Sequence, residues 1–502
     1  MGSAREFASD SRLHSENSPS RHEWPLETNE IGGREEFLMK RVPIVIATVV
    51  LLFAGAMVPG ATTASAAPND FVLEAKGPLT QGHINAVLNA GGTVNFQHAG
   101  TGLVVARSEN SAFARQVLDS GVFSSATPDR VVKWTPDVHP QDLGEAAVTP
   151  SDETFWNLQW APAAIDAPGA WAAGCTGEGV RVAIVDGGIW NTHVDLVANL
   201  DVAHSISFVP GFAYNQDVGT FWHATHVAGI VAAADNGIGT IGIAPKATLI
   251  GVKVLHNGSG SFGAVISGIL YAATPIAQGG GGADIINMSL GAVFPKNEPG
   301  AGPLVAALNK AVNYADRFGV LVVSAAGNDG LDLDHSGNYI SVPAQSGSGI
   351  AVSATGPIGF AVGYPNGATN FDHPASYTNF GNSVIFVAAP GGDFVYPGNE
   401  NCTMPRIPSG TVTVPCWVFD MVMSSVRGSG ASTATYSWAA GTSMAAPAAS
   451  AVAAIIKGVN PGITLGALKN RLAQSADDKG KIGHDPYYGR GFVNAKRACT
   501  GN

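Results

Sequence analysis

Charged side chains are scarce in this sequence of 502 residues. They make up 13% of the chain, against about 25% in ordinary soluble proteins. A disordered chain is rich in charge and poor in apolar residues, whereas 45% of these residues are hydrophobic and 63 are glycine. The formal net charge is −11, whereas a duplex-binding protein carries a basic surface. The composition therefore predicts a folded protein, long enough for more than one domain, and argues against nucleic acid as a partner.

Cysteine is also rare. The chain has four, at Cys175, Cys402, Cys416 and Cys499. None forms a CxxC pair, so a structural zinc site is not indicated. An even, sparse count in an exported protein favours disulfides. We expect Cys402 to pair with Cys416, which closes a short loop, and Cys175 to pair with Cys499 by elimination. Three connectivities are formally open, and free buried thiols are the alternative.

Residues 39–66 have the composition of a signal peptide. Residues 39–41 are a basic start, 42–58 an apolar run, and 64–66 (Ala-Ser-Ala) a small-residue cleavage signature. A membrane anchor is the alternative, because the apolar run approaches the length needed to span a bilayer, but the small, polar stretch after it favours cleavage. Residues 1–38 lie upstream of this signal, and we expect them to have no structural role. The sequence thus predicts a secreted, extracellular protein.

Two parts follow the signal. Residues 67–135 read as a small α+β unit, with strands expected at 71–75, 93–97, 102–107 and 131–134 and helices near 84–88 and 111–118. Residues 136–152 are rich in proline and acidic residues and read as a linker.

The remaining part, residues 153–502, alternates short apolar runs with helical patterns. Strands are expected at 180–185, 249–255, 285–288 and 319–324, and helices at 225–234 and 304–318. The runs are almost continuously apolar, which is typical of strands covered on both faces. This alternation predicts an α/β fold, a doubly wound and mainly parallel sheet with helices on both faces. Functional sites in such sheets lie beyond the carboxyl ends of the strands.

Asp186 ends one of these apolar strands and precedes Gly187 and Gly188. A carboxylate at that place can accept a hydrogen bond from a histidine ring and hold the ring in one tautomer. The alternative is an aspartate that opens a glycine turn.

Two histidines, His223 and His226, begin a helical stretch. Zinc sites of the HExxH type need the histidines four apart with a glutamate between them, and that pattern is absent here. One histidine as a general base and the other as a structural neighbour fits better, although the spacing alone does not assign the roles.

Ser443 lies in Gly441–Pro447, just before an alanine-rich helix that runs to about Lys457. A serine at a helix N-terminus lies at the positive end of the helix dipole, which favours negative charge developing nearby. An ordinary N-cap serine is the alternative.

Together, the segments around Asp186, His223 and Ser443 resemble the three active-site signatures of the subtilisin-like serine peptidase family, which has the same order of residues. The resemblance extends over residues 150–502. It implies that Ser443 is the nucleophile, His223 the general base and Asp186 the residue that orients it, with His226 structural. It also implies that Asn328 donates to the oxyanion together with the Ser443 backbone N–H.

The same resemblance implies further sites. Peptide substrate would lie along two segments, which are Ser289, Leu290 and Gly291, and Ala325, Ala326 and Gly327. Because both segments are uncharged, we expect the substrate to have an apolar or uncharged P1 residue. A structural calcium ion, which prefers six to eight oxygen ligands, would be held by the side chains of Asp195 and Asn236 and the carbonyls of Ala234, Ile238 and Thr240, with Gln159 as a further ligand. The alternative is a glycine-rich turn without metal. No organic cofactor is expected.

The unit at 67–135 resembles the family's inhibitory propeptide. The chain would then be a zymogen, cut by its own site within about 136–152, with its propeptide as inhibitor and folding aid. An unrelated accessory domain is the alternative. Otherwise we expect protein or peptide substrates and a monomer.

Two other functions were weighed. A catalytically silent fold used for binding would lack a triad residue or Asn328, and none is lacking. An esterase of the α/β-hydrolase type needs Gly-x-Ser-x-Gly and the order Ser, Asp, His, whereas Ser443 lies in Gly-Thr-Ser-Met-Ala and comes last.

Overall fold

A computed structural model describes residues 65–501, except for 137–140, 146–152, 220, 368–369, 396–398 and 429–431. For residues 65–68 and 141–145 it describes the backbone only. The predicted extension, 1–38, and nearly all of the predicted signal peptide, 39–66, lie outside the described residues.

The centre of the fold is an eight-stranded sheet with the order β15-β14-β12-β10-β6-β8-β7, in which β16 also pairs with β14. All of its pairings are parallel except that of β15 with β14. Its strands are β6 (Arg181–Asp186), β7 (Ile206–Ser207), β8 (Thr248–Lys253), β10 (Ile285–Met288), β12 (Leu321–Ala325), β14 (Ile350–Gly356), β15 (His373–Pro374) and β16 (Ile385–Pro390). The four strands expected from the sequence are therefore β6, β8, β10 and β12, and the predicted α/β fold is confirmed.

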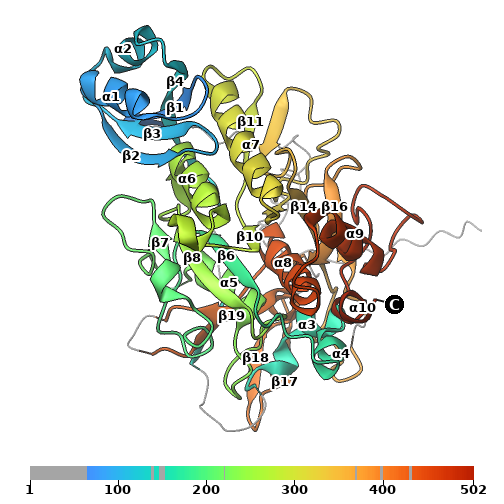
Figure 1. Cartoon of the computed structure of the whole chain (residues 1–502). Coiled ribbons are helices and arrows are strands. Elements are labelled where there is room, and N and C mark those ends of the chain that lie inside the picture. Colours follow the sequence, from blue (N-terminus) through green and yellow to red (C-terminus); the bar gives the residue numbers. More distant parts are fainter. Residues whose placement is uncertain are drawn as a thin grey trace, which may run out of the picture. The chain divides into compact units, whose positions relative to one another are not determined.

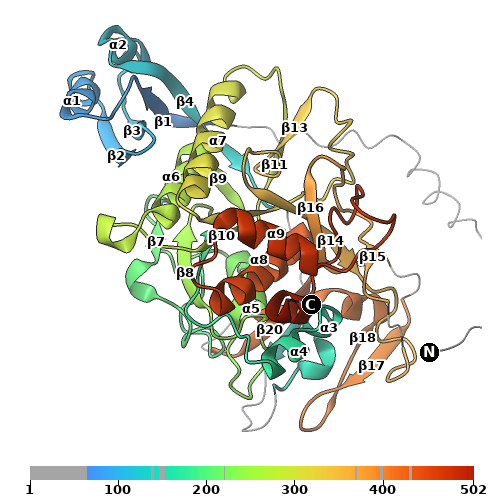
Figure 2. The same ribbon diagram turned by 45° about the vertical axis from the view of Figure 1, so that its right-hand side comes forward.

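Helices cover both faces of this sheet because its strands are apolar on both sides. In β6, Val182 and Ile184 pack in one buried cluster with α5 (His223–Ala232) and α8 (Thr442–Val459). The alternate residues, Ala183 and Val185, pack in a second cluster, because successive side chains of a strand point to opposite faces. That second cluster also contains α6 (Phe262–Ala273) and α7 (Ala301–Arg317). Figure 2 shows α8 in front of the sheet, near α9 (Leu465–Ser475) and α10 (Ala495–Thr500).

Helix α8 is long and apolar enough to cross a membrane, but 83% of it is buried inside the fold. Its apolar surface is thus accounted for by contacts with the sheet and with α5, as expected for a core helix.

The N-terminal unit is a small α+β sandwich, shown in blue in Figure 1. Its elements are β1 (Ser65–Ala75), α1 (Gln81–Asn89), β2 (Thr93–His98), β3 (Leu103–Arg107), α2 (Phe113–Asp119) and β4 (Phe123–Lys133). Strand order is β2-β3-β1-β4-β9, so the sheet continues into β9 (Ser259–Ser261) of the larger part. Sequence patterns did not reveal this pairing, because β9 is three residues long and contains a glycine.

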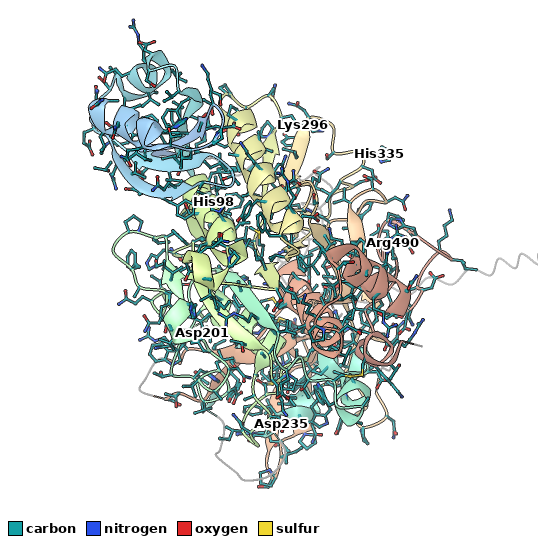
Figure 3. The ribbon with its side chains drawn as sticks, viewed as in Figure 1. His98, Asp201, Asp235, Lys296, His335 and Arg490 are labelled. Carbon is teal, nitrogen blue, oxygen red and sulfur yellow. A yellow bond between two sulfur atoms is a disulfide. The ribbon has the colours of Figure 1, made fainter. Side chains whose placement is uncertain are left out.

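Helices α6 and α7 contact this unit directly (Figure 1). Asp129 is buried, and both of its carboxylate oxygens accept from the Gly263 N–H in the first turn of α6, at 3.1 and 3.0 Å. Lys310 of α7 pairs with Glu74 at 2.6 Å. His98, labelled in Figure 3, lies 3.2 Å from the Thr274 hydroxyl that follows α6.

Two disulfides join the expected cysteines. Cys402 and Cys416 link β17 (Asn401–Pro405) to the end of β18 (Thr411–Pro415). Cys175, which follows α4 (Ala167–Ala172), is bonded to Cys499 of α10.

The remaining strands form small sheets beside the central one. Strand β11 (Ala292–Pro295) pairs with β13 (Tyr339–Val342), and β19 (Val422–Val426) pairs with β20 (Thr435–Ala439). The segment predicted as a linker contains strand β5 (Gln141–Glu145), which pairs with the other edge of β20. A short helix, α3 (Trp160–Ala164), precedes α4.

Candidate active site

Asp186 and His223 meet at the carboxyl edge of the central sheet. Asp186 is the last residue of β6, and His223 is the first residue of α5. The His223 Nδ1 atom lies 3.0 and 2.9 Å from the two carboxylate oxygens of Asp186. Both side chains are buried. This pairing fixes Nδ1 as the protonated nitrogen and leaves Nε2 as a proton acceptor.

The pKa of His223 is set by opposing effects. Burial lowers it, but the charge and hydrogen bond of Asp186, together with the charge of Asp217, raise it above 6.5. His226, one turn along α5, differs: burial and the neighbouring His223 lower its pKa to about 3. Its Nε2 lies 3.2 Å from the Ser437 carbonyl, so it is a neutral ring that joins α5 to β20.

Ser443 lies in the first turn of α8 and is 5% exposed. Its hydroxyl donates to the carbonyl of Ser289 at 3.1 Å, and the Ser289 hydroxyl donates to the Ser443 carbonyl at 2.7 Å. Among the described residues, no hydrogen bond joins Ser443 to His223. Rotation about the Cα–Cβ bond of Ser443 would redirect its hydroxyl.

Asn328 is oriented by the residue before Ser443. Its side-chain oxygen accepts from the Thr442 backbone N–H at 2.9 Å and from the Thr442 hydroxyl at 2.8 Å. Because the oxygen end is held by these two donors, the amide nitrogen is the end left to donate toward the cleft. Asn328 and Ser443 line the same hollow of about 200 Å³.

The two predicted substrate segments border this hollow. Leu290 and Gly291 follow β10 on one side; Ala325 and Gly327, at the end of β12, lie on the other. Ser289 faces Ser443 as described above. Ala326 is turned away from the hollow, because its N–H donates to Val352 and its carbonyl accepts from the Asn379 side chain.

The chain's own residues 133–136 also line the hollow. The carbonyl of Trp134 accepts from the Gly291 N–H at 2.9 Å, and the N–H groups of Trp134 and Thr135 point to the Gly258 carbonyl at 2.8 and 3.2 Å. The Trp134 side chain is 1% exposed and packs edge-on against Phe262 at 5.0 Å. This segment is therefore bonded between Gly291 on one side and Gly258 on the other.

A buried lysine lies under the turn that follows Asp186. Lys253 ends β8, is fully buried, and donates to the carbonyls of Gly187 and Leu255. Its ammonium group lies 3.9 Å from Asp217, on the loop before His223. Burial lowers the pKa of Lys253, and the two carboxylates oppose that effect. No sequence pattern indicates a role for this lysine, because Gly187 and Asp217 lie on loops distant from it in the chain.

Four of the residues predicted to hold calcium, Ala234, Asn236, Ile238 and Thr240, lie on the loop after α5, which Asp235 marks in Figure 3, whereas Asp195 and Gln159 come from earlier segments of the chain. Asp195 is buried, and burial raises its pKa to about 7. Its carboxylate accepts from the Thr240 N–H and hydroxyl at 3.2 and 3.3 Å and lies 3.4 Å from the Asn236 side-chain nitrogen. No described cation pairs with it. Within the described residues, no hydrogen bond is directed at the carbonyls of Ala234, Ile238 or Thr240.

Two side chains beside this loop, Gln159 and Glu153, differ from the predicted set of calcium ligands. Both ends of the Gln159 amide are bonded to the backbone of Ile241, at 3.0 and 3.1 Å, which competes with a role as a metal ligand. Glu153, which the sequence did not single out, accepts from the N–H groups of Asn236 and Gly237 at 3.2 and 3.3 Å.

Comparison with known proteins supports one family. The model of the subtilase family matches residues 177–491. Subtilisin Savinase of Lederbergia lenta is 34% identical over 343 residues, which is 68% of this chain and 98% of that protein. M-protease of Shouchella clausii is 34% identical over 343 residues, covering 68% of this chain and 70% of that protein. Among solved structures, a protease of Pseudoalteromonas arctica matches with a TM-score of 0.53 and 28% identity, covering 70% of this chain and 99% of that one. The chain therefore belongs to the subtilase family and is a subtilisin-like serine endopeptidase.

Proposed function

We propose that Asp186, His223 and Ser443 are the catalytic triad of a secreted peptidase that is made as a self-processing zymogen. The observation that carries this proposal is the buried pair of His223 and Asp186 at the edge of the sheet, together with the hollow that Ser443, Asn328 and the chain's own residues 133–136 line. The direct test is the mass and activity of the product made with and without Ser443.

In this mechanism, the Ser443 Oγ attacks the scissile carbonyl carbon while His223 Nε2 takes the hydroxyl proton. Asp186 stabilises the imidazolium that forms. The negative oxygen of the tetrahedral intermediate accepts from the Asn328 amide and the Ser443 backbone N–H. The carbon–nitrogen bond then breaks as His223 returns the proton to the leaving amine. Water, activated by His223 in the same way, hydrolyses the acyl-enzyme and restores Ser443.

The zymogen proposal rests on how the N-terminal unit enters the cleft. Strand β4 pairs with β9, Trp134 is bonded to Gly291, and Pro136 lines the hollow with Ser443. Within the predicted cleavage region, 136–152, β5 pairs with β20, the strand that leads toward Ser443. These pairings support self-cleavage by the chain's own site. The 67–135 unit would then remain as an inhibitor until it is degraded.

Replacing Trp134 with alanine should weaken this inhibition. Removal of a fully buried tryptophan costs about 3–5 kcal/mol, which corresponds to at least a 100-fold loss of affinity. We expect the cut precursor to become active with a shorter lag than the native chain, measured by hydrolysis of a chromogenic peptide. Leu118→Ala, an exposed position on α2, serves as the control. An unchanged lag in Trp134→Ala would contradict the role of this side chain.

A structural calcium ion would fit the loop at Asp195. The buried carboxylate without a described cation and the three free carbonyls provide the hard oxygen ligands that calcium prefers. When bound, the ion would neutralise Asp195 and stiffen the segment after α5, apart from the chemistry at Ser443. Asn236 and Glu153 offer further side-chain oxygens, whereas Gln159 would first have to leave Ile241.

Chelation should therefore lower thermal stability. An ion present at 100 times its dissociation constant stabilises the folded state by about 2.7 kcal/mol, and EGTA should remove that contribution. We expect Asp195→Asn to abolish the difference between melting curves with and without calcium, while Asp235→Asn on the same loop retains it. Identical curves for the native protein in EGTA and in calcium would exclude the site.

The pH dependence should follow His223. Catalysis needs the neutral ring, and Asp186 and Asp217 raise its pKa above 6.5, so kcat/KM should fall as the pH drops through that raised value. The neighbouring His226 stays neutral, because burial lowers its pKa to about 3, and the ammonium group of Lys253 lies 3.9 Å from Asp217. Asp217→Asn removes one stabilising charge, so the acid limb should move to lower pH. A limb that stays in place would show that Asp217 does not act on His223.

The proposed secretion rests on the signal-like residues 39–66 and on the relatives being subtilisins. In this proposal the mature enzyme is an extracellular monomer that cuts protein or peptide substrates.

A further inference from the structure

A hollow of about 660 Å³ lies beside the N-terminus of α5, next to the candidate catalytic histidine. Nothing in the proposed mechanism uses it. Its walls come from the turn after Asp186, the loop before His223, the β8–β9 turn and the end of β19. The lining side chains include Trp190, Phe212, Asp217, Trp222, His256 and Arg427.

Arg427 is fixed in this hollow by two indole rings. Its guanidinium carbon lies 4.5 Å from the Trp190 ring centre and 4.9 Å from that of Trp222. The two indoles meet edge to face at 5.2 Å. Stacking on aromatic faces holds an arginine in place without using its N–H donors. The guanidinium is therefore ordered before any ligand arrives.

Two donor groups that line this hollow, the Arg427 guanidinium and the Trp190 indole N–H, have no hydrogen-bond partner among the described residues. The guanidinium forms no hydrogen bond or ion pair with any residue that the structure describes, and its Nε is buried without an acceptor. The indole N–H of Trp190 is likewise buried and unpaired. Unpaired donors are costly in a folded protein. A planar acceptor that met the fork of Arg427 would relieve that cost, and a carboxylate has that geometry.

The one carboxylate among the lining residues, Asp217, does not cancel the charge of Arg427. Its Oδ1 accepts from the Asn257 N–H at 3.2 Å and from the Val218 N–H at 3.0 Å. Buried Lys253 lies 3.9 Å away, and His256 lies 3.7 Å away. The negative charge of Asp217 is therefore offset by these neighbouring groups of the protein, and the charge that remains to bind a ligand is that of Arg427.

Two walls of this hollow continue along the chain into the candidate active site. His256, on one wall, is two residues before Gly258, whose carbonyl accepts from the N–H groups of Trp134 and Thr135. Trp222, on another wall, directly precedes His223. Both connections favour a ligand that extends from the substrate cleft toward Arg427.

We propose that this hollow is a specificity subsite in which Arg427, held between Trp190 and Trp222, binds an acidic side chain of the peptide substrate. The proposal rests on the proposed peptidase function. It adds a preference for one acidic substrate residue to a cleft whose two predicted substrate segments are uncharged.

The test uses the matured native enzyme and quenched peptide substrates. The two peptides of each pair differ at one position, where one has Glu and the other has Gln. From pair to pair, this position moves by one residue along both sides of the scissile bond. We expect one position at which Glu gives a kcat/KM about tenfold above Gln, as for a charge-assisted hydrogen bond at a partly exposed site. The gain should lie in KM and should shrink as sodium chloride is added.

Arg427→Gln should abolish this preference and leave cleavage of the Gln peptides unchanged. Arg427→Lys, which keeps the charge but loses the planar fork, should retain part of it. Arg406→Gln is the matched control, since Arg406 also lies over an aromatic ring, Phe155, at 5.0 Å, and also has a buried unpaired Nε.

A Glu-to-Gln ratio near one at every position, or a preference in native enzyme that salt does not reduce, would overturn the subsite even if Arg427→Gln fails to fold. If the preference for Glu persists in Arg427→Gln, the subsite that binds the acidic side chain lies elsewhere. Failure to cut any peptide, including the uncharged ones, would instead count against the proposed peptidase function.

Discussion

A chain with Ser443→Ala should remain full length after its signal is removed and should digest no casein. The only atom lost is the Ser443 Oγ, whose role as attacking atom no neighbouring group can assume. Loss of the nucleophile from such a triad lowers turnover by about 10⁶-fold. We expect intact mass spectrometry to show the 67–135 unit still attached, whereas the native chain loses it by a cut within about 136–152.

Ser475→Ala is a suitable control, because Ser475 is also a buried helical serine, on α9, bonded only within its own helix. Trace native enzyme added to Ser443→Ala should cut the same bond in trans, which would show that the precursor is correctly folded. Spontaneous processing of the variant in a host without other proteases would assign the nucleophile to another residue.

Asn328→Ala should lower kcat by about 10²–10³-fold with little change in KM, as expected for one oxyanion donor. The amide nitrogen interacts with the oxygen only after it becomes negative, so binding of the ground state is hardly affected. The alanine variant also leaves the Thr442 N–H and hydroxyl without their acceptor, which costs about 1–3 kcal/mol of stability.

Asn328→Asp separates these effects. It keeps an oxygen for Thr442, and thus the local fold, but it has no N–H to donate when ionised. Its kcat should fall at least as far as that of the alanine variant, while its melting temperature stays closer to the native value. A rise in KM with unchanged kcat in both variants would assign Asn328 to substrate binding instead.

The sequence predicted the sheet, and the places of Asp186, His223 and Ser443 at the ends of its elements, because the relevant signals are local. Asp186 follows a buried strand, and His223 and Ser443 begin helices, so each residue could be placed at the correct edge from its neighbours in the chain. The apolar runs of β6, β8, β10 and β12 are long enough to indicate strands without any partner.

Features that depend on contacts between distant segments could not be predicted in this way. The lysine at 253 looks like the polar end of a strand, and only the fold shows that Gly187 and Asp217 surround it. Likewise, β5 has few apolar residues and pairs with a strand about 290 residues later. Gln159 was placed at the calcium loop by resemblance, whereas the fold joins its amide to Ile241.

The bond between Cys175 and Cys499 closes a ring of chain whose ends are 324 residues apart. A peptidase that nicks its own loops would therefore stay one covalent molecule after any single cut inside that ring, and only a reducing agent would separate the pieces. Cuts before Cys175 are different, because nothing covalent retains what lies upstream. The cross-link would thus sort such cuts into two kinds, those that release the proposed inhibitory unit and those that leave the catalytic part as one covalent molecule.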